Sequence, residues 1–474
     1  MRQPYRVLYS NDVTHILACD SPYHPHGSRN LTQEMFRASI RETARCGVDV
    51  HMIQPIHGWW ACWRGELQPL EEQLRFLRES NRTPDPFTQY LADGGDFMTE
   101  MIDECRRCGL HPFASVRMND AHHGVNPPCR FYAEHPEWRL NPDGNSWNDR
   151  GQNWAVPEVR DYKFNLIRDL CEHVDLDGLE LDFMRVGVLF RSWETTWEER
   201  RAVMTGYVAR IRQMLDTLPG ARRALSIRLP AHEAHRRAMG LDPAALMNAG
   251  ADMFNFSHYF YTASEVPLKP LAEALPESSC YLEMTNCIGI GRSVEDRDGD
   301  TSELQQAGAD DFYTTAAGAY AAGFAGVSLF NFVYTRRFGS EKKKGEYREP
   351  PFDLIPRLGD PEFLRKTPKV YTIGSTWEAA RLPRVMTLFG QYTYLEFHNV
   401  LEAETDAVLL LSVETEGRGK WEAWFNDRPV TGERPFEWRI PRAFIRAGSN
   451  RLALRSCEGA RSVILKAELK PLQE

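Results

Sequence analysis

Short apolar runs alternate with longer amphipathic segments through most of this sequence. Residues 158–167 and 309–322 are two segments with helical periodicity. Buried parallel strands appear as apolar runs, and each needs a crossover helix to reach the next, so this alternation is typical of a parallel α/β sheet. The apolar runs cover residues 5–11, 48–54, 111–119, 176–183, 224–230, 251–259, 280–286 and 325–332.

Eight strand–helix units in about 330 residues predict an α/β fold, namely a (β/α)8 TIM barrel with enlarged loops. The alternative is a doubly wound open sheet. No G-x-G-x-x-G pattern follows the first apolar run, which disfavours the dinucleotide-binding form of that sheet. We therefore expect a catalytic barrel over residues 1–335.

The pattern changes after the barrel. Residues 336–380 begin with a stretch rich in Arg, Lys, Gly and Pro, which predicts a loop, a closing helix and a linker. From residue 381 the chain shows short alternating strands separated by turn signals such as Asn426-Asp427. Six or more short strands in about 95 residues predict a C-terminal all-β sandwich domain over residues 381–474.

Charge and hydropathy limit the partners. The chain of 474 residues has a net charge of −9 and no basic run, which argues against nucleic acid. No apolar run approaches the ~20 residues of a membrane span. The first residues lack the apolar core of a signal peptide, so we expect a cytoplasmic protein, or a secreted or periplasmic one if a signal was removed. We expect no cofactor, and either a monomer or a homodimer.

The fourth apolar run carries two acids, Glu180 and Asp182, in the stretch DGLELDFMR. Side chains on a strand alternate sides, so both acids point into the barrel if the intervening leucines face the helices. By the same parity Arg117 and Arg228 also point inward, and we expect Glu180 to bond one of them. Asp182 lies nearer the C-terminal end, where such barrels carry their active sites, and is the expected reacting group. The alternative is that both acids belong to a buried ion-pair network.

A second inward acid, Glu283, stands on the seventh run. Strands four and seven can bring two carboxyl groups within the ~5–10 Å that glycoside hydrolysis uses. Glu283 would then be the general acid and Asp182 the nucleophile or base. Glu283 could instead be a partner of Arg228 or His258. Either Asp120 or Asp12, which also follow strand ends, could be the true acid.

Other strand ends are polar or aromatic, a combination that suits sugar rings and hydroxyl groups. Loop packing is the alternative for Trp59 and Trp60. His122 and His123, together with His57, His258 or Asp120, form an alternative metal site. The metal site is disfavoured because no H-x-H motif ends the first strand. The expected substrate-binding residues are Asn11, Asp12, His57, Trp59, Trp60, Arg117, Asn119, His122, His123, Glu180, Arg185, Arg228, His258, Tyr259 and Asn331.

Four motifs occur in a characteristic order: SVRMNDAHH (115–123), HPEW (135–138), NWAVPEVR (153–160) and DGLELDF (177–183). Their order resembles that of uncharacterised glycosyl-hydrolase-like (β/α)8 families. The resemblance covers residues 5–370 and implies a barrel that acts on carbohydrate. A strand-four aspartate also resembles the nucleophile of the α-amylase and α-galactosidase superfamilies, which implies this role for Asp182 and favours α-glycosidic bonds. Family 18 chitinases carry a catalytic Glu where this chain has Met184, so chitinase-type chemistry is not expected.

The expected function is therefore hydrolysis of a glycosidic bond in an oligo- or polysaccharide. A non-catalytic carbohydrate-binding barrel and a metal-dependent hydrolase that uses the histidines are the alternatives. In the sandwich domain, the aromatic residues of segment 421–428 could bind sugar, but packing against the barrel is the favoured interpretation.

Overall fold

The structure is a computed structural model. It describes residues 4–19, 21–23, 30–55, 58–122, 129–144, 146–258, 265–289, 304–339, 349–374, 384–386, 391–415, 420–432, 434–457 and 462–472.

Eight strands form a closed parallel barrel in the order β1-β10-β7-β6-β5-β4-β3-β2. Every one of the eight predicted runs contains one barrel strand, so the predicted TIM barrel is confirmed. Residues buried throughout the strands account for their apolar sequences. The strands are β1 (Val7–Asn11), β2 (Val50–Ile53), β3 (His111–Arg117), β4 (Gly178–Asp182), β5 (Ala224–Pro230), β6 (Met253–Ser257), β7 (Ser279–Thr285) and β10 (Gly326–Phe330).

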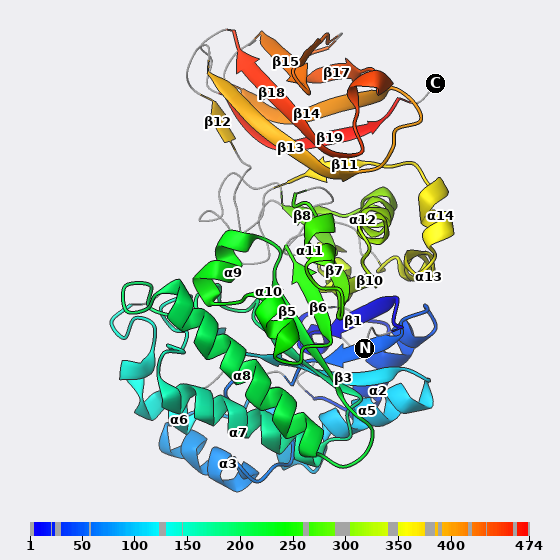
Figure 1. Ribbon diagram of the computed structural model, residues 1–474. Coiled ribbons are helices and arrows are strands. Elements are labelled where there is room, and N and C mark those ends of the chain that lie inside the picture. The colour runs from blue at the N-terminus through cyan, green and yellow to red at the C-terminus, as the bar shows by residue number, and fades with distance from the viewer. Residues whose placement is uncertain are drawn as a thin grey trace. The chain divides into compact units, whose positions relative to one another are not determined.

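Helices connect the barrel strands, and local signals set their ends. Helix α8 begins with a capping box, in which Thr196 and Glu199 satisfy each other's backbone N–H groups. Helices α7 and α8 lie side by side outside the strands (Figure 1). The α-helices up to the end of the barrel are α1 (His15–Ala18), α2 (Gln33–Ala44), α3 (Leu70–Glu79), α4 (Pro86–Ala92), α5 (Phe97–Arg107), α6 (Arg130–Glu134), α7 (Pro157–His173), α8 (Trp197–Thr217), α9 (Glu233–Met239), α10 (Pro243–Asn248), α11 (Lys269–Glu273) and α12 (Ala309–Ala321).

The chain packs as two compact units. The first comprises Met1–Phe256, Glu277–Ser279 and Arg336–Phe352, and the second comprises Ser257–Pro276, Cys280–Thr335 and Asp353–Glu474. The second unit also holds a two-stranded sheet of β8 (Cys287–Gly289) and β9 (Leu304–Gln306), followed further along by helices α13 (Ile355–Leu358) and α14 (Pro361–Lys366). No helix in the described ranges is long and apolar enough to cross a membrane.

The C-terminal strands form two antiparallel sheets, which confirms the predicted sandwich. Apolar side chains from both sheets, including Phe397, Leu409, Phe425 and Leu452, make one buried core. One sheet has the order β11-β19-β14-β17, with β12 also paired to β19, and the other has the order β13-β18-β15-β16. The strands are β11 (Tyr371–Ile373), β12 (Arg384–Met386), β13 (Tyr392–Val400), β14 (Ala407–Thr415), β15 (Trp421–Phe425), β16 (Arg428–Val430), β17 (Glu437–Ile440), β18 (Gly448–Ser456) and β19 (Ser462–Pro471).

Strand β11 falls in the segment expected to be a linker, and it pairs with β19. The turn predicted at Asn426-Asp427 joins β15 to β16. Both residues have positive φ, at 50° and 65°, as a tight two-residue hairpin turn requires.

Candidate functional site

Strand β4 directs Glu180 and Asp182 into the barrel, as the alternation predicted. The parallel register places Glu180 beside Ser115 on β3 and Ser226 on β5. Two residues further on, Asp182 stands beside Arg117 and Arg228. The two acids therefore occupy successive layers, with hydroxyl groups flanking the first and guanidinium groups flanking the second.

Glu180 is fully buried and accepts hydrogen bonds from neutral groups. Its Oε1 accepts from Ser115 Oγ at 2.8 Å, and its Oε2 accepts from Ser226 Oγ at 3.2 Å and from Asn255 Nδ2 at 3.3 Å. Arg117, expected as one possible partner, instead donates to Asp12, Asp120 and Gln54. Glu180 thus sits in a polar layer at the barrel interior.

Asp182 is also fully buried, at the C-terminal end of β4. Its Oδ1 accepts from the Met184 backbone N–H at 2.8 Å and from Arg228 Nη1 at 2.9 Å. Its Oδ2 has no hydrogen-bond partner among the described residues, and Arg185 Nε lies 3.5 Å from it. The carboxylate is therefore held by one oxygen, while Arg185 stands beside the other.

Arg117 and Arg185 link the ends of four strands. Both donate to Asp12, at 3.0 Å and 2.9 Å, and both donate to Gln54 Oε1, at 2.9 Å and 2.8 Å. Arg117 also contacts Asp120 Oδ2 at 3.2 Å. Burial disfavours the charged form of Asp12, but the two arginines outweigh it and hold the pKa of this carboxyl below its ordinary value.

Asp120 is in a similar position. Burial would raise the pKa of its carboxyl group, but His122 and Arg117 hold that pKa well below the ordinary value. His122 Nδ1 is hydrogen-bonded to Asp120 Oδ1. Asp12 and Asp120 are thus stabilised as carboxylates, and neither has the raised pKa typical of a proton donor.

The loop after β2 brings Trp59 and Trp60 into the interior. Each is only 3% exposed, and Trp59 Nε1 donates to the Asp120 carbonyl at 3.1 Å. The ammonium group of Lys163 on α7 lies 3.9 Å from the centre of the Trp59 ring and donates to the carbonyl oxygens of Gly58 and Arg117. Burial lowers the pKa of Lys163 to about 7.

Asp169, also on α7, anchors the same loop. Its Oδ2 accepts from Trp63 Nε1 at 2.8 Å, and its Oδ1 accepts from the backbone N–H groups of Glu66 and Leu67 at 2.8 Å and 3.1 Å. A Cβ on Gly65 would lie 1.8 Å from Asp169 Oδ2, which accounts for a glycine at that position. The Trp59–Leu67 segment is therefore held rigidly to α7.

Two of the expected binding residues hold other parts of the chain together. Asn119 exchanges hydrogen bonds with the Gln152 backbone, and its Nδ2 also donates to the Val188 carbonyl at 3.0 Å. Asn11 Nδ2 lies 2.9 Å from Nε2 of His51. Burial lowers the pKa of His51 to about 3, so its imidazole is neutral in the fold.

In the second unit, Glu283 is 3% exposed and accepts from Ser257 Oγ at 2.6 Å. Asn331 follows β10 with a φ of 54°, and its Oδ1 is buried without a hydrogen-bond partner in the described residues. A positive φ on a non-glycine residue at a strand end is the kind of strain found at functional sites. His57, His123 and Tyr259 lie outside the described residues.

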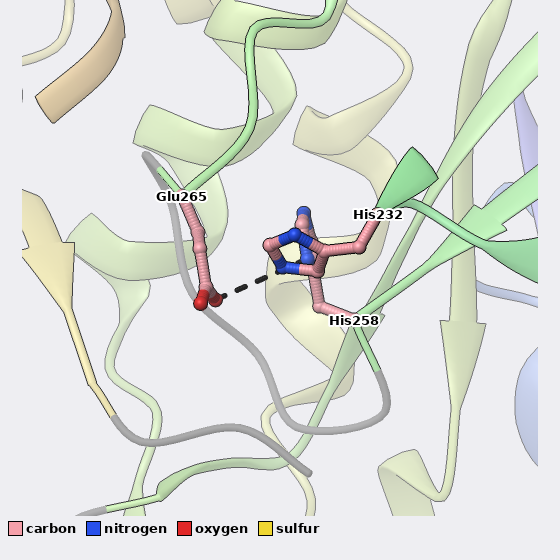
Figure 2. A group of neighbouring side chains, drawn as sticks. All are labelled: His232, His258 and Glu265. Atoms are coloured by element: carbon pink, nitrogen blue, oxygen red, sulfur yellow. Dashed lines mark ion pairs between the residues drawn. The ribbon is translucent and has the colours of Figure 1, made fainter. Parts of the chain in front are cut away.

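His258 belongs to a group of buried possible metal ligands. Its Nδ1 lies 4.0 Å from Glu265 Oε2, and both residues follow β6. Figure 2 shows His258 and Glu265 with His232; one possible ligand atom of each residue lies within 4.8 Å of the others. Two imidazoles and a carboxylate are a donor set that suits Zn²⁺.

Sequence reasoning did not select Lys163, Asp169, His232 or Glu265. Lys163 and Asp169 look like ordinary polar positions on a helix, and only the tertiary structure shows that they are buried. Gln54 had a signal, because it directly follows an apolar run, but nothing in the sequence showed that two arginines share its oxygen.

No family model matches this chain, and no curated protein matches it. Three solved structures resemble it at low identity. They are a cycloisomaltooligosaccharide glucanotransferase from Paenibacillus sp. (TM-score 0.38, 10% identity, 98% of this chain and 57% of that chain), a family 36 α-galactosidase from Geobacillus stearothermophilus (0.39, 11%, 95% and 55%) and an α-amylase from Lactobacillus plantarum (0.42, 11%, 98% and 98%). The chain spans a little over half the length of the first two. We draw no functional conclusion from likenesses this distant.

Proposed function

We propose that this protein is a glycoside hydrolase that cleaves a glycosidic bond in an oligo- or polysaccharide. Asp182 acts as nucleophile or base and Glu283 as general acid. The observation that carries the proposal is the state of Asp182, an inward carboxylate at the C-terminal end of β4. One of its oxygens is fixed by Met184 N–H and Arg228, and the other accepts no hydrogen bond from the described residues.

The same geometry defines a requirement for substrate access. Asp182 is 0% exposed, and Arg185 Nε lies 3.5 Å from Oδ2. A sugar reaches Oδ2 only when the Arg185 side chain moves aside. Arg185 also binds Asp12 and Gln54, so these two residues hold it over the carboxylate.

The test is sugar release from a panel of aryl glycosides and polysaccharides, with and without EDTA. We expect release by the wild type that is indifferent to EDTA and falls by about 10³-fold or more in Asp182→Asn. The matched control is Asp161→Asn, which alters an exposed acid on α7 and should leave release unchanged. Circular dichroism checks that each variant is folded.

Adding azide to Asp182→Ala sharpens the assignment, because azide can take the place of a missing carboxylate at the sugar carbon. A glycosyl azide product would support the nucleophile or base role. Full activity in a folded Asp182→Asn variant would remove this residue from the mechanism. Sugar binding without release by the wild type would favour the non-catalytic barrel.

The second candidate function is metal-dependent hydrolysis, and the group of His258, Glu265 and His232 favours it. It requires that EDTA abolish release and that added Zn²⁺ restore it. His258→Gln should then lose both activity and bound zinc, whereas Asp182→Asn should keep its zinc.

A further inference from the structure

The outer face of one sheet in the sandwich domain carries exposed aromatic side chains. The register places Tyr394 on β13, Ala453 on β18, Trp424 on β15 and Pro429 on β16 in one row across the sheet. None of these four belongs to the core between the two sheets, whose residues alternate with them along the strands. The row therefore presents an apolar strip on the face directed away from the core.

Tyr392 extends this strip on the same strand as Tyr394. The two tyrosines are 45% and 50% exposed, although large aromatic side chains are usually well buried. Their rings are stacked at 6.2 Å with an interplanar angle of 16°, and the Tyr392 ring lies 5.4 Å from that of Trp424. We call Tyr392, Tyr394 and Trp424 the aromatic face.

Arginine side chains hold these rings in place. The Arg455 guanidinium lies 5.5 Å from the Tyr392 ring centre and 5.4 Å from the Trp424 ring centre, while Arg451 lies 5.4 Å from that of Tyr394. Arg455 is in turn ion-paired with Glu422 on the neighbouring strand. Rings fixed in this way lose little conformational freedom when a ligand covers them.

The charges around the rings are balanced. Arg455 is paired with Glu422, and Arg451 with Asp427 at 2.5 Å. A paired cation has little attraction left for an anionic polymer, whereas the donors and acceptors of both pairs suit hydroxyl groups. The chemistry that fits is a ligand with apolar faces and many hydroxyls, but no net charge.

We propose that the aromatic face is a binding site for a neutral polysaccharide chain, separate from the acids of the barrel. Sugar rings stack their C–H faces on the tyrosine and tryptophan rings, and their hydroxyls bond to the flanking arginine and carboxylate groups. The site deepens the proposed function by naming the ligand as polymeric. It stands on its own geometry, however, and does not require that the barrel be active.

The structure separates the two interpretations of the 421–428 segment. Trp421 packs against the sandwich core and against the Phe436 ring at 5.7 Å, so packing is correct for this tryptophan. Trp424 lies on the opposite side of β15 with the two tyrosines. The sequence alone did not join the tyrosines of β13 to the tryptophan of β15, because they are about thirty positions apart.

The test uses the full-length Asp182→Asn variant, which removes hydrolysis under the proposed mechanism. Binding is measured by affinity electrophoresis in starch, β-glucan, mannan, galactan and xylan, with polygalacturonate as the anionic comparison. We expect retardation by at least one neutral polymer, weakened about tenfold by Trp424→Ala and by Tyr394→Ala. Tyr394→Phe keeps the ring and should retain most of the binding. Trp193→Ala removes a tryptophan that is 76% exposed elsewhere and should bind as the parent does.

Four results would overturn the proposal: no retardation by any neutral polymer, equal binding by the alanine variants, equal loss in Trp193→Ala, or preference for polygalacturonate. A change in oligomeric state of Tyr394→Ala in light scattering would also overturn it, by making this face a contact between copies of the chain. Hydrolysis of small aryl glycosides by the same alanine variants, made with Asp182 intact, tests the barrel separately. If it is unchanged while polymer binding is lost, the two sites are distinct.

Discussion

Arg228 and Asp182 form an ion pair in which both side chains are completely shielded from solvent, with 2.9 Å between Arg228 Nη1 and Asp182 Oδ1. Removing two charges from water is costly, and only close, well-oriented contacts offset that cost. The second contact of Asp182 Oδ1, to Met184 N–H, adds to the orientation. The pair therefore links β4 to β5 at the layer where the proposed chemistry takes place.

A double-mutant cycle on this pair should show strong coupling. Arg228→Met alone should destabilise the protein by about 3–5 kcal/mol, because it leaves a carboxylate buried without its cation. The double variant with Asp182→Asn should lose less than the sum of the single changes, by about 1 kcal/mol or more. Urea unfolding measures each free energy. The same cycle on the more exposed Arg201–Asp242 pair is the control and should give at most about 1 kcal/mol. Equal coupling in both cycles would contradict the role assigned to burial.

Lys163 should make stability depend on pH above neutrality. Burial lowers its pKa from 10.5 to about 7, so between these values the unfolded chain binds a proton that the folded chain lacks. The free energy of unfolding should therefore rise with pH in this window, by at most roughly 1.4 kcal/mol per pH unit from this group. Lys163→Met should lack this contribution. Urea unfolding of both proteins from pH 7 to pH 10 tests it, and parallel curves would show that Lys163 does not titrate as described.

Asp169 should be needed to hold the tryptophan-rich loop. Asp169→Ala leaves the Trp63 indole N–H and two backbone N–H groups without their acceptor, which should cost about 2–4 kcal/mol of stability. Glu172→Ala is the control on the same helix, because Glu172 is half-exposed and makes only a 3.9 Å contact to Arg168. Its unfolding free energy should change by less than about 0.5 kcal/mol. Similar losses in both variants would mean that the loop does not depend on Asp169.

The fold was largely predictable because each barrel strand is buried on both faces and so leaves an apolar run. The direction of Glu180 and Asp182 was also predictable, because strand parity depends only on position in the sequence. Which side chains would meet was not. In a parallel sheet this depends on register, which put Ser115 and Ser226 beside Glu180 and left the arginines for Asp182. The partners of Glu180 could not be inferred without that one offset.

The candidate site shows the same division. Asp12, Asp120, Arg117 and Arg185 were all selected as residues near strand ends, and the structure brings them into one network. Trp59 and Trp60 were selected for stacking on sugar, yet both are almost fully covered. Composition shows that aromatics gather after a strand, but their exposure depends on Asp169 and Lys163, which lie about a hundred positions away.

The network of Arg117, Arg185, Asp12 and Gln54 has a consequence for molecular recognition. Long side chains such as arginine normally sample many rotamers, and restricting them when a ligand arrives opposes binding through entropy. Here the two guanidinium groups are already restrained by shared acceptors from β1 and from the end of β2. That restriction is imposed when the chain folds, so a molecule entering from the C-terminal ends of these strands meets a surface whose shape is set in advance.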